Sequence, residues 1–214
     1  MKTFVKFCGL RTPEEVREVP DGGAAGFVIQ VDGSPRSLTT EAATELIAHV
    51  PTEAEAWAVV VDPDSELIHE LFDEVGVDRI QVYGPVPAGL EFLEVHHLVP
   101  SMAIPAKSTG ADPPVPAAED YPRVHLDAAG QPLPGGSGVR PDWEACARII
   151  DAHPGRKFVL AGGLTPENVA DALATVRPWG VDVSSGVESA PGVKDLARMR
   201  AFKAAVEAFE SGHA

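Results

Sequence analysis

The chain has 214 residues, 44% of them hydrophobic, and a formal net charge of −15 at pH 7. A chain of this length can bury a sizeable core without disulfides, and its acidity argues against non-specific nucleic-acid binding, which needs a basic surface. We see no apolar run that could cross a membrane and no signal-peptide pattern. Cys8 and Cys146, the two cysteines, lack metal-ligand spacing, so we expect a reduced, cytoplasmic protein without a metal site.

The first half of the chain alternates apolar, β-branched segments with segments of helical spacing. Strands are predicted over residues 3–9, 24–30, 55–61 and 78–83. Helices are predicted from Thr12, over residues 39–49 and over residues 64–75. The first of these has a strong start signal, because Thr12-Pro-Glu-Glu15 combines a capping box with proline in the first turn. This alternation is typical of a parallel α/β fold.

The pattern lapses in the middle of the chain and then resumes. A fifth strand is predicted within residues 95–102, but proline, glycine, alanine and aspartate dominate from Ile104 to Pro122, where no helical face can be drawn. We interpret this segment as a degenerate fifth helix or a loop in its place. A sixth strand is predicted over residues 123–127, followed by a glycine-rich loop and a helix over residues 142–152.

Two successive strand–glycine–helix units follow. In the first, the apolar run 158–161 leads into Gly162 and Gly163, and Thr165-Pro-Glu-Asn168 carries a helix cap and a first-turn proline. In the second, the run that starts at Val181 breaks into Ser184, Ser185 and Gly186. Small residues at such turns expose backbone N–H groups that bind phosphate well. The pair predicts the phosphate loops after strands 7 and 8 of a (β/α)8 barrel, so that residues 1–214 form a single domain closed by a helix over residues 194–210.

Several of these motifs together resemble the phosphoribosylanthranilate isomerase family, whose members act in tryptophan biosynthesis. The matching segments occur in family order and are Lys6-Phe-Cys-Gly9, Ser34-Pro-Arg36 with Ser37, Leu126-Asp127 with Gly135-Gly-Ser-Gly138, Leu160-Ala-Gly-Gly-Leu164 with Pro166-Glu-Asn168, and Asp182-Val-Ser-Ser-Gly-Val-Glu188. Only the region from Gly84 to Pro122 matches poorly. A glycine pair alone fits many phosphate-binding barrels, but the set is specific.

The resemblance implies an isomerase that rearranges a phosphorylated aminoaldose, N-(5-phosphoribosyl)anthranilate, into the aminoketose. By resemblance Asp127 is the acid and Cys8 the base, and no metal or organic cofactor is required. Lys6 lies on the same strand face as Cys8 and is a candidate to help its thiol lose a proton. Arg36 is expected to clamp the anthranilate carboxylate.

Other residues are expected to bind the sugar phosphate. Main-chain groups of Gly162, Gly163, Ser184 and Ser185 are expected to hold the phosphate itself. We infer that Asp182, on the strand face of Ser184, contacts a sugar hydroxyl or orients the loop. We expect no nucleic-acid or membrane partner, and either a monomer or a homodimer.

One departure from the family pattern concerns the position where histidine is usual after strand 4. Gln81-Val-Tyr-Gly84 places Tyr83 there, and tyrosine can stack or donate a hydrogen bond but cannot shuttle protons near neutral pH. Two alternatives stay open. One is the related aminoaldose isomerase of histidine synthesis, which expects aspartate at the position of Cys8, and the other is a non-catalytic sugar-phosphate-binding barrel. Taken singly, Cys8 could also be a packing residue and Asp127 a turn former.

Overall fold

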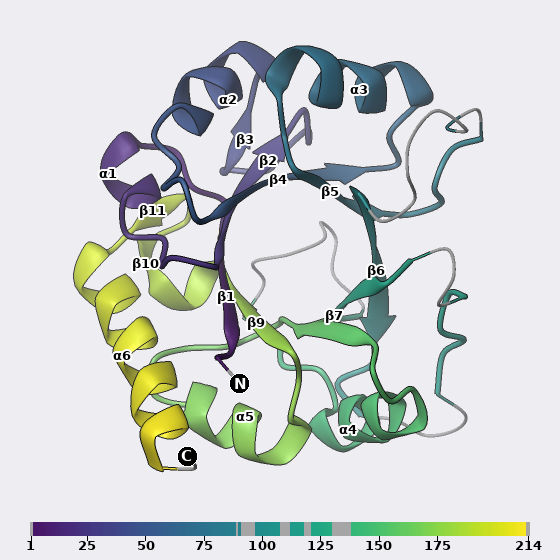
Figure 1. The fold of residues 1–214 in the computed structure, drawn as a ribbon, viewed down its shortest axis with the longest axis vertical. Helices are drawn as coiled ribbons and strands as arrows, with labels where there is room; N and C mark the ends of the chain where they lie inside the picture. Colours follow the sequence, from purple (N-terminus) through teal and green to yellow (C-terminus); the bar gives the residue numbers. More distant parts are fainter. Residues whose placement is uncertain are drawn as a thin grey trace.

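A closed ring of parallel strands forms the centre of the molecule in the computed structural model, with helices around it (Figure 1). The structure describes residues 2–88, 90, 97–107, 112–117, 121–129 and 138–212. One nine-stranded sheet runs in the order β1-β9-β8-β7-β6-β5-β4-β2-β3, and β1 also pairs with β2, which closes the ring. The strand β3 pairs with β2 and extends the sheet beyond the ring. The predicted (β/α)8 barrel is therefore confirmed.

The strands of the ring lie within a few residues of the predicted segments, whereas the short β3 outside the ring was not predicted. The bounds of the strands in this sheet are β1 Phe4–Cys8, β2 Ala24–Ile29, β3 Ser37–Leu38, β4 Glu55–Val61, β5 Arg79–Tyr83, β6 Leu98–Ile104, β7 Arg123–Ala128, β8 Lys157–Leu160 and β9 Gly180–Val183. Most positions of these strands are buried on both faces, as near-continuous runs of Val, Ile, Ala and Phe predict for a parallel sheet covered by helices.

The surrounding helices begin at the caps that the sequence indicates. Their bounds are α1 Pro13–Val16, α2 Thr40–Ile47, α3 Ser65–Glu70, α4 Trp143–Ala152, α5 Val169–Val176 and α6 Leu196–Gly212. The side chains of Thr12, Thr39, Asp64 and Asp142 each accept a hydrogen bond from the first turn of their helix.

The helix predicted over residues 64–75 is confirmed, because the π-helical turn η1, Leu71–Val75, continues α3 and Gly76 in the left-handed conformation ends it. Two other helix boundaries differ from the prediction. The helix expected from Thr165 begins at Val169, because Thr165 caps a separate turn by accepting from Glu167 N at 3.2 Å. The closing helix begins after Lys194, because a short hairpin of β10 (Glu188–Ala190) and β11 (Val193–Lys194) intervenes.

No helix is found among the described residues of the predicted irregular segment between β6 and β7, namely 105–107, 112–117 and 121–122. This agrees with the prediction that the fifth helix is degenerate or replaced by a loop. The Arg156 guanidinium donates to carbonyl oxygens of Pro116 and Tyr121, so part of this segment is bonded to a side chain of the loop before β8. Most of the glycine loop expected before α4, residues 130–137, lies outside the described residues.

Inside the ring, side chains form layers along the barrel axis. The layer at the amino ends of the strands is apolar and aromatic, and Phe4 stacks on Trp179 with ring centroids 4.5 Å apart. The next layer is polar and fully buried, with Lys6, Gln81 and His125 at 0% exposure. Alternation along β1, β5 and β7 then places Cys8, Tyr83 and Asp127 at the carboxyl ends of the strands, two residues further on. In the part of the chain that the structure describes, no helix is long and apolar enough to span a membrane.

Candidate active site

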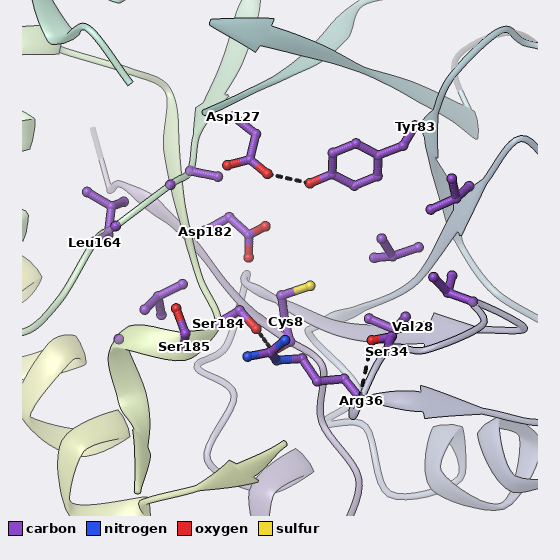
Figure 2. Close-up of a pocket in the computed structure, with 18 residues that line it drawn as sticks. Cys8, Val28, Ser34, Arg36, Tyr83, Asp127, Leu164, Asp182, Ser184 and Ser185 are labelled. Atoms are coloured by element: carbon purple, nitrogen blue, oxygen red, sulfur yellow. Dashed lines mark hydrogen bonds between the residues drawn. The ribbon is translucent and has the colours of Figure 1, made fainter. Parts of the chain in front are cut away.

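A pocket opens at the carboxyl ends of the barrel strands and encloses about 610 Å³ of space, counting its mouth. Cys8, Arg36, Tyr83, Asp127 and Asp182 line it, and so do the loop residues Gly162, Gly163, Ser184 and Ser185. The structure thus brings every site residue that the sequence predicts into one cavity (Figure 2). Its position is where active sites of such barrels lie.

The thiol and the carboxyl group predicted for proton transfer converge on this pocket from different strands. Cys8 ends β1, Asp127 lies on β7, and Figure 2 shows both side chains reaching into the cavity. Tyr83 Oη donates to Asp127 Oδ2 at 2.7 Å, and the Ala128 N–H donates to Asp127 Oδ1 at 2.8 Å. Burial, followed by the Asp127 charge, raises the pKa of Tyr83 well above its ordinary value. Tyr83 is therefore a hydrogen-bond donor that fixes the carboxyl group.

A buried ionic cluster lies beneath the pocket. Lys6 Nζ donates to Asp182 Oδ2 at 2.8 Å, and His125 Nε2 donates to the same oxygen at 2.9 Å. The Gln81 amide nitrogen lies 3.1 Å from His125 Nδ1. Burial raises the pKa of Asp182, but Lys6 and His125 outweigh it and the net shift is downward. Asp182 is thus an ionised carboxylate, and its other oxygen, Oδ1, has no hydrogen-bond partner among the residues that the structure describes.

One wall of the pocket carries a second ionic cluster. Arg36 donates through Nε and Nη2 to the two oxygens of Glu188, both at 2.7 Å, and Lys194 Nζ donates to Glu188 Oε1 at 2.6 Å. Lys194 also donates to Ser184 Oγ at 3.2 Å, and Ser184 Oγ donates to the Cys8 carbonyl oxygen at 3.0 Å. These bonds use one edge of the planar guanidinium, so its other edge can still receive a carboxylate from a ligand.

The loops after β8 and β9 form an adjoining wall. Gly162 and Gly163 both have positive φ, 87° and 62°, a conformation that glycine adopts without strain. The Asn168 side chain donates to the Gly163 carbonyl oxygen at 2.9 Å and accepts from Thr165 N at 2.8 Å, which fixes the turn. Ser185 starts the 3₁₀ helix η3, Ser185–Val187. Small residues in such turns leave the main chain open to an anion.

The remaining wall is apolar. Val28, Val59 and Val61 line the pocket and pack with Tyr83 and Cys8. A flat aromatic ring is well matched to such a surface, since burying apolar area is favourable by roughly 25 cal/mol per Å². The pocket therefore offers a ligand an apolar wall, a cationic group beside it and a glycine- and serine-rich wall.

Some functional residues were missed by sequence reasoning. His125 and Gln81 each lie two residues before a predicted pocket residue, so strand alternation could have indicated them. Glu188 was part of a matching motif, but nothing in its spacing indicates a pair with Arg36. Lys194 was assigned to the closing helix, which was wrong, because it lies in β11 and its side chain reaches the pocket wall.

The fold and the pocket define a class of protein: a (β/α)8-barrel enzyme that places a thiol and a carboxyl group beside the loops of its last two strand–helix units. Residues 5–205 match the family model described as N-(5'phosphoribosyl)anthranilate (PRA) isomerase. The chain therefore belongs to this isomerase family, as the sequence motifs predicted, and not to the histidine-pathway family weighed as an alternative.

Individual members of the family are similar over nearly the whole chain. The N-(5'-phosphoribosyl)anthranilate isomerase of Agrobacterium fabrum is 38% identical over 222 residues, which cover 99% of this chain and 98% of the relative. The crystal structure of the enzyme from Thermus thermophilus has a TM-score of 0.77 and 30% identity, covering 96% of this chain and 99% of that one. A further family structure, with a TM-score of 0.71 and 27% identity over 96% of this chain and 99% of that one, is a complex with reduced 1-(o-carboxyphenylamino)-1-deoxyribulose 5-phosphate.

Proposed function

We propose that this chain converts N-(5-phosphoribosyl)anthranilate into 1-(2-carboxyphenylamino)-1-deoxyribulose 5-phosphate in tryptophan biosynthesis, with Asp127 as the acid and Cys8 as the base. The observation that carries the proposal is the convergence of these two groups in one pocket, between an apolar wall with Arg36 and the loops at Gly162 and Ser184. Family membership supports the same reaction.

The reaction requires a proton donor and a proton acceptor in turn. Asp127 gives a proton to the furanose ring oxygen, and the C1′–O bond breaks as the nitrogen lone pair forms a protonated Schiff base. The Cys8 thiolate removes the proton from C2′, and the electron pair of that C–H bond moves toward the nitrogen to give an enolamine. The ketone forms when C1′ takes up a proton and the C2′ hydroxyl releases one. Positioned acid and base groups contribute roughly 10²–10⁴-fold each.

Each remaining part of the substrate is expected to bind a different wall of the pocket. The anthranilate ring packs on the wall of Val28 and Val59, and its carboxylate binds the open edge of the Arg36 guanidinium. The phosphate binds main-chain groups of Gly162, Gly163, Ser184 and Ser185. The unpaired Oδ1 of Asp182 accepts from a sugar hydroxyl. Arg36→Met is accordingly expected to raise KM at least tenfold with little change in kcat, a loss of about 1.4 kcal/mol of binding free energy.

The test is turnover of the fluorescent anthranilate derivative by purified protein, with Cys8→Ala and Asp127→Asn as variants. Each substitution is expected to lower kcat by about 10²-fold or more while the circular dichroism spectrum stays unchanged. Complementation of a tryptophan auxotroph that lacks this isomerase checks the pathway. Near-wild-type rates in both folded variants would exclude the mechanism, and failure of the wild type to complement would favour the non-catalytic barrel.

The pH dependence follows from the thiol. Burial raises the pKa of Cys8, and the opposing charge of Lys6 only partly offsets this, so the net shift is upward. Since only the thiolate is a base, kcat/KM is expected to rise with pH through the neutral range and into the alkaline range. A profile that is flat from pH 6 to pH 9 would contradict the assignment of Cys8.

Two broader expectations remain predictions of the same proposal. Residues 1–214 are expected to fold as one domain, either as a monomer or as a homodimer, which light scattering can distinguish. Cys8 and Cys146 are both unpaired among the described residues, which suits the reducing cytoplasm where we expect the chain to work.

A further inference from the structure

The polar layer beneath the pocket contains three fully buried side chains to which the reaction above gives no role. Lys6, Gln81 and His125 are completely buried, and Asp182 is 5% exposed. Barrel interiors are usually filled by branched apolar side chains. Buried charges are costly unless they are paired, and here the Lys6 ammonium is paired with Asp182 at 2.8 Å.

The backbone makes room for this lysine. An ideal Cβ on Gly26 of β2 would lie 2.9 Å from Lys6 Cε and 3.1 Å from Lys6 Nζ. Gly26 also pairs with Cys8 in the β1–β2 register. The missing side chain at Gly26 therefore provides the space that the Lys6 side chain occupies inside the ring.

Lys6 acts on the thiol two residues further along β1. Both side chains lie on the same face of β1, and Lys6 Nζ and Cys8 Cα each lie 3.1 Å from the position of an ideal Cβ on Gly26, so the positive charge of Lys6 is close enough to lower the pKa of Cys8. Burial lowers the pKa of Lys6, but Asp182 and Cys8 outweigh it, so the net shift is upward and the amine stays charged. His125 donates to the same carboxylate oxygen and so helps to hold Asp182 in place.

We propose that Lys6 is a positioning residue for the base: anchored by Asp182 and His125, its buried ammonium supplies the positive charge against which the Cys8 thiolate forms. This inference rests on the proposed function, in which Cys8 removes the C2′ proton. The thiolate accepts that proton and becomes a neutral thiol, while Lys6 keeps all its protons and its charge throughout.

Other charged or titratable groups also face Cys8. They determine in which direction each substitution shifts the pH at which the thiol loses its proton. Asp182 on β9 is a negative charge that opposes thiolate formation, and Lys194 on β11 is a second positive charge that favours it. Tyr83 on β5 and Asp127 on β7 line the same pocket. Removing Lys6 should therefore disfavour the thiolate, whereas neutralising Asp182 should favour it. A residue that only supports the fold would not produce opposite signs.

The experiment measures alkylation of Cys8 by iodoacetamide as a function of pH, without substrate. A Cys146→Ala background leaves Cys8 as the only cysteine. Lys6→Met is expected to raise the pH midpoint of alkylation by at least one unit, which is about a tenfold lower rate near neutral pH. Asp182→Asn is expected to lower the midpoint. If Lys6→Met loses its circular dichroism spectrum, Lys6→Gln replaces it, because glutamine keeps a donor for Asp182.

A matched control comes from the opposite end of the barrel interior. Arg123 donates to Glu55 at 2.6 Å and its guanidinium carbon lies 4.9 Å from the centroid of the Trp179 ring, so Arg123→Met also breaks a partly buried ionic cluster. It is expected to leave the Cys8 midpoint unchanged. Unchanged midpoints in the folded Lys6 and Asp182 variants, or shifts of the same sign in both, would overturn the inference. Because no turnover is measured, that outcome is separate from failure of the proposed reaction, which Cys8→Ala tests.

Discussion

Replacing Glu188 by glutamine tests how strongly one carboxylate holds two cations at the edge of the pocket. Glu188 is 4% exposed and accepts from Arg36 at 2.7 Å on each oxygen and from Lys194 at 2.6 Å. A hydrogen bond to a charged group contributes roughly 1.5–3 kcal/mol, but these bonds share one carboxylate and glutamine keeps one acceptor oxygen. We expect the free energy of unfolding to fall by about 3 kcal/mol at pH 7, near the lower end for a broken buried ion pair.

The pH dependence of this loss identifies its electrostatic origin. Burial raises the pKa of Glu188, but the bonds from Arg36 and the charge of Lys194 outweigh it and hold the pKa below its ordinary value. A carboxylate of this kind stabilises the fold above its unfolded pKa of about 4.3, and this stabilisation is lost as the pH falls through the folded pKa. The difference between wild type and variant should thus be full at pH 7 and shrink below about pH 4.

Urea unfolding at several pH values measures both quantities, provided that the transitions are two-state. Glu167→Gln is the matched control, because Glu167 pairs with Arg198 on the surface at 3.2 Å and is 65% exposed, so its loss should leave stability nearly unchanged. A Glu188→Gln loss under about 0.5 kcal/mol, the size of an ordinary surface substitution, would refute the reasoning. So would a loss of the same size at every pH.

Three further substitutions probe the site and its surroundings. Tyr83→Phe removes the donor 2.7 Å from Asp127 and is expected to lower kcat about tenfold, equal to about 1.4 kcal/mol; an unchanged kcat would mean that this bond does not orient the acid. Gly186→Ala places a Cβ 1.8 Å from the Leu164 carbonyl oxygen, so the two anion loops must separate and KM should rise at least tenfold, as initial rates would show. Cys146→Ala removes a buried sulfur outside the pocket and should cost about 1 kcal/mol in urea unfolding with kcat and KM unchanged.

Short-range sequence patterns predicted much of the fold. Apolar, β-branched runs predicted the strands within a few residues, and the cap residues Thr12, Thr39 and Asp142 predicted where helices begin. Proline-rich composition predicted the irregular segment in place of the fifth helix. These features depend on interactions within a few residues of the chain, so they can be recognised without knowledge of the rest of the molecule.

Much of the membership of the site was also predictable, since parallel barrel strands end at one face and residues at their carboxyl ends must meet there. The pairing of those residues was not. Lys6 and Asp182 are 176 positions apart, Arg36 and Glu188 are 152 apart, and Tyr83 and Asp127 are 44 apart.

The sequence by itself determined the alternation of strands and helices, the loops suited to an anion, and the residue types that can move protons. Only the tertiary structure decided which cation neutralises which carboxylate, and which edge of the Arg36 guanidinium is left for a ligand. The physical reason is that these contacts depend on how the ring closes between β1 and β2 and on the stagger of its strands, and both are properties of the whole sheet.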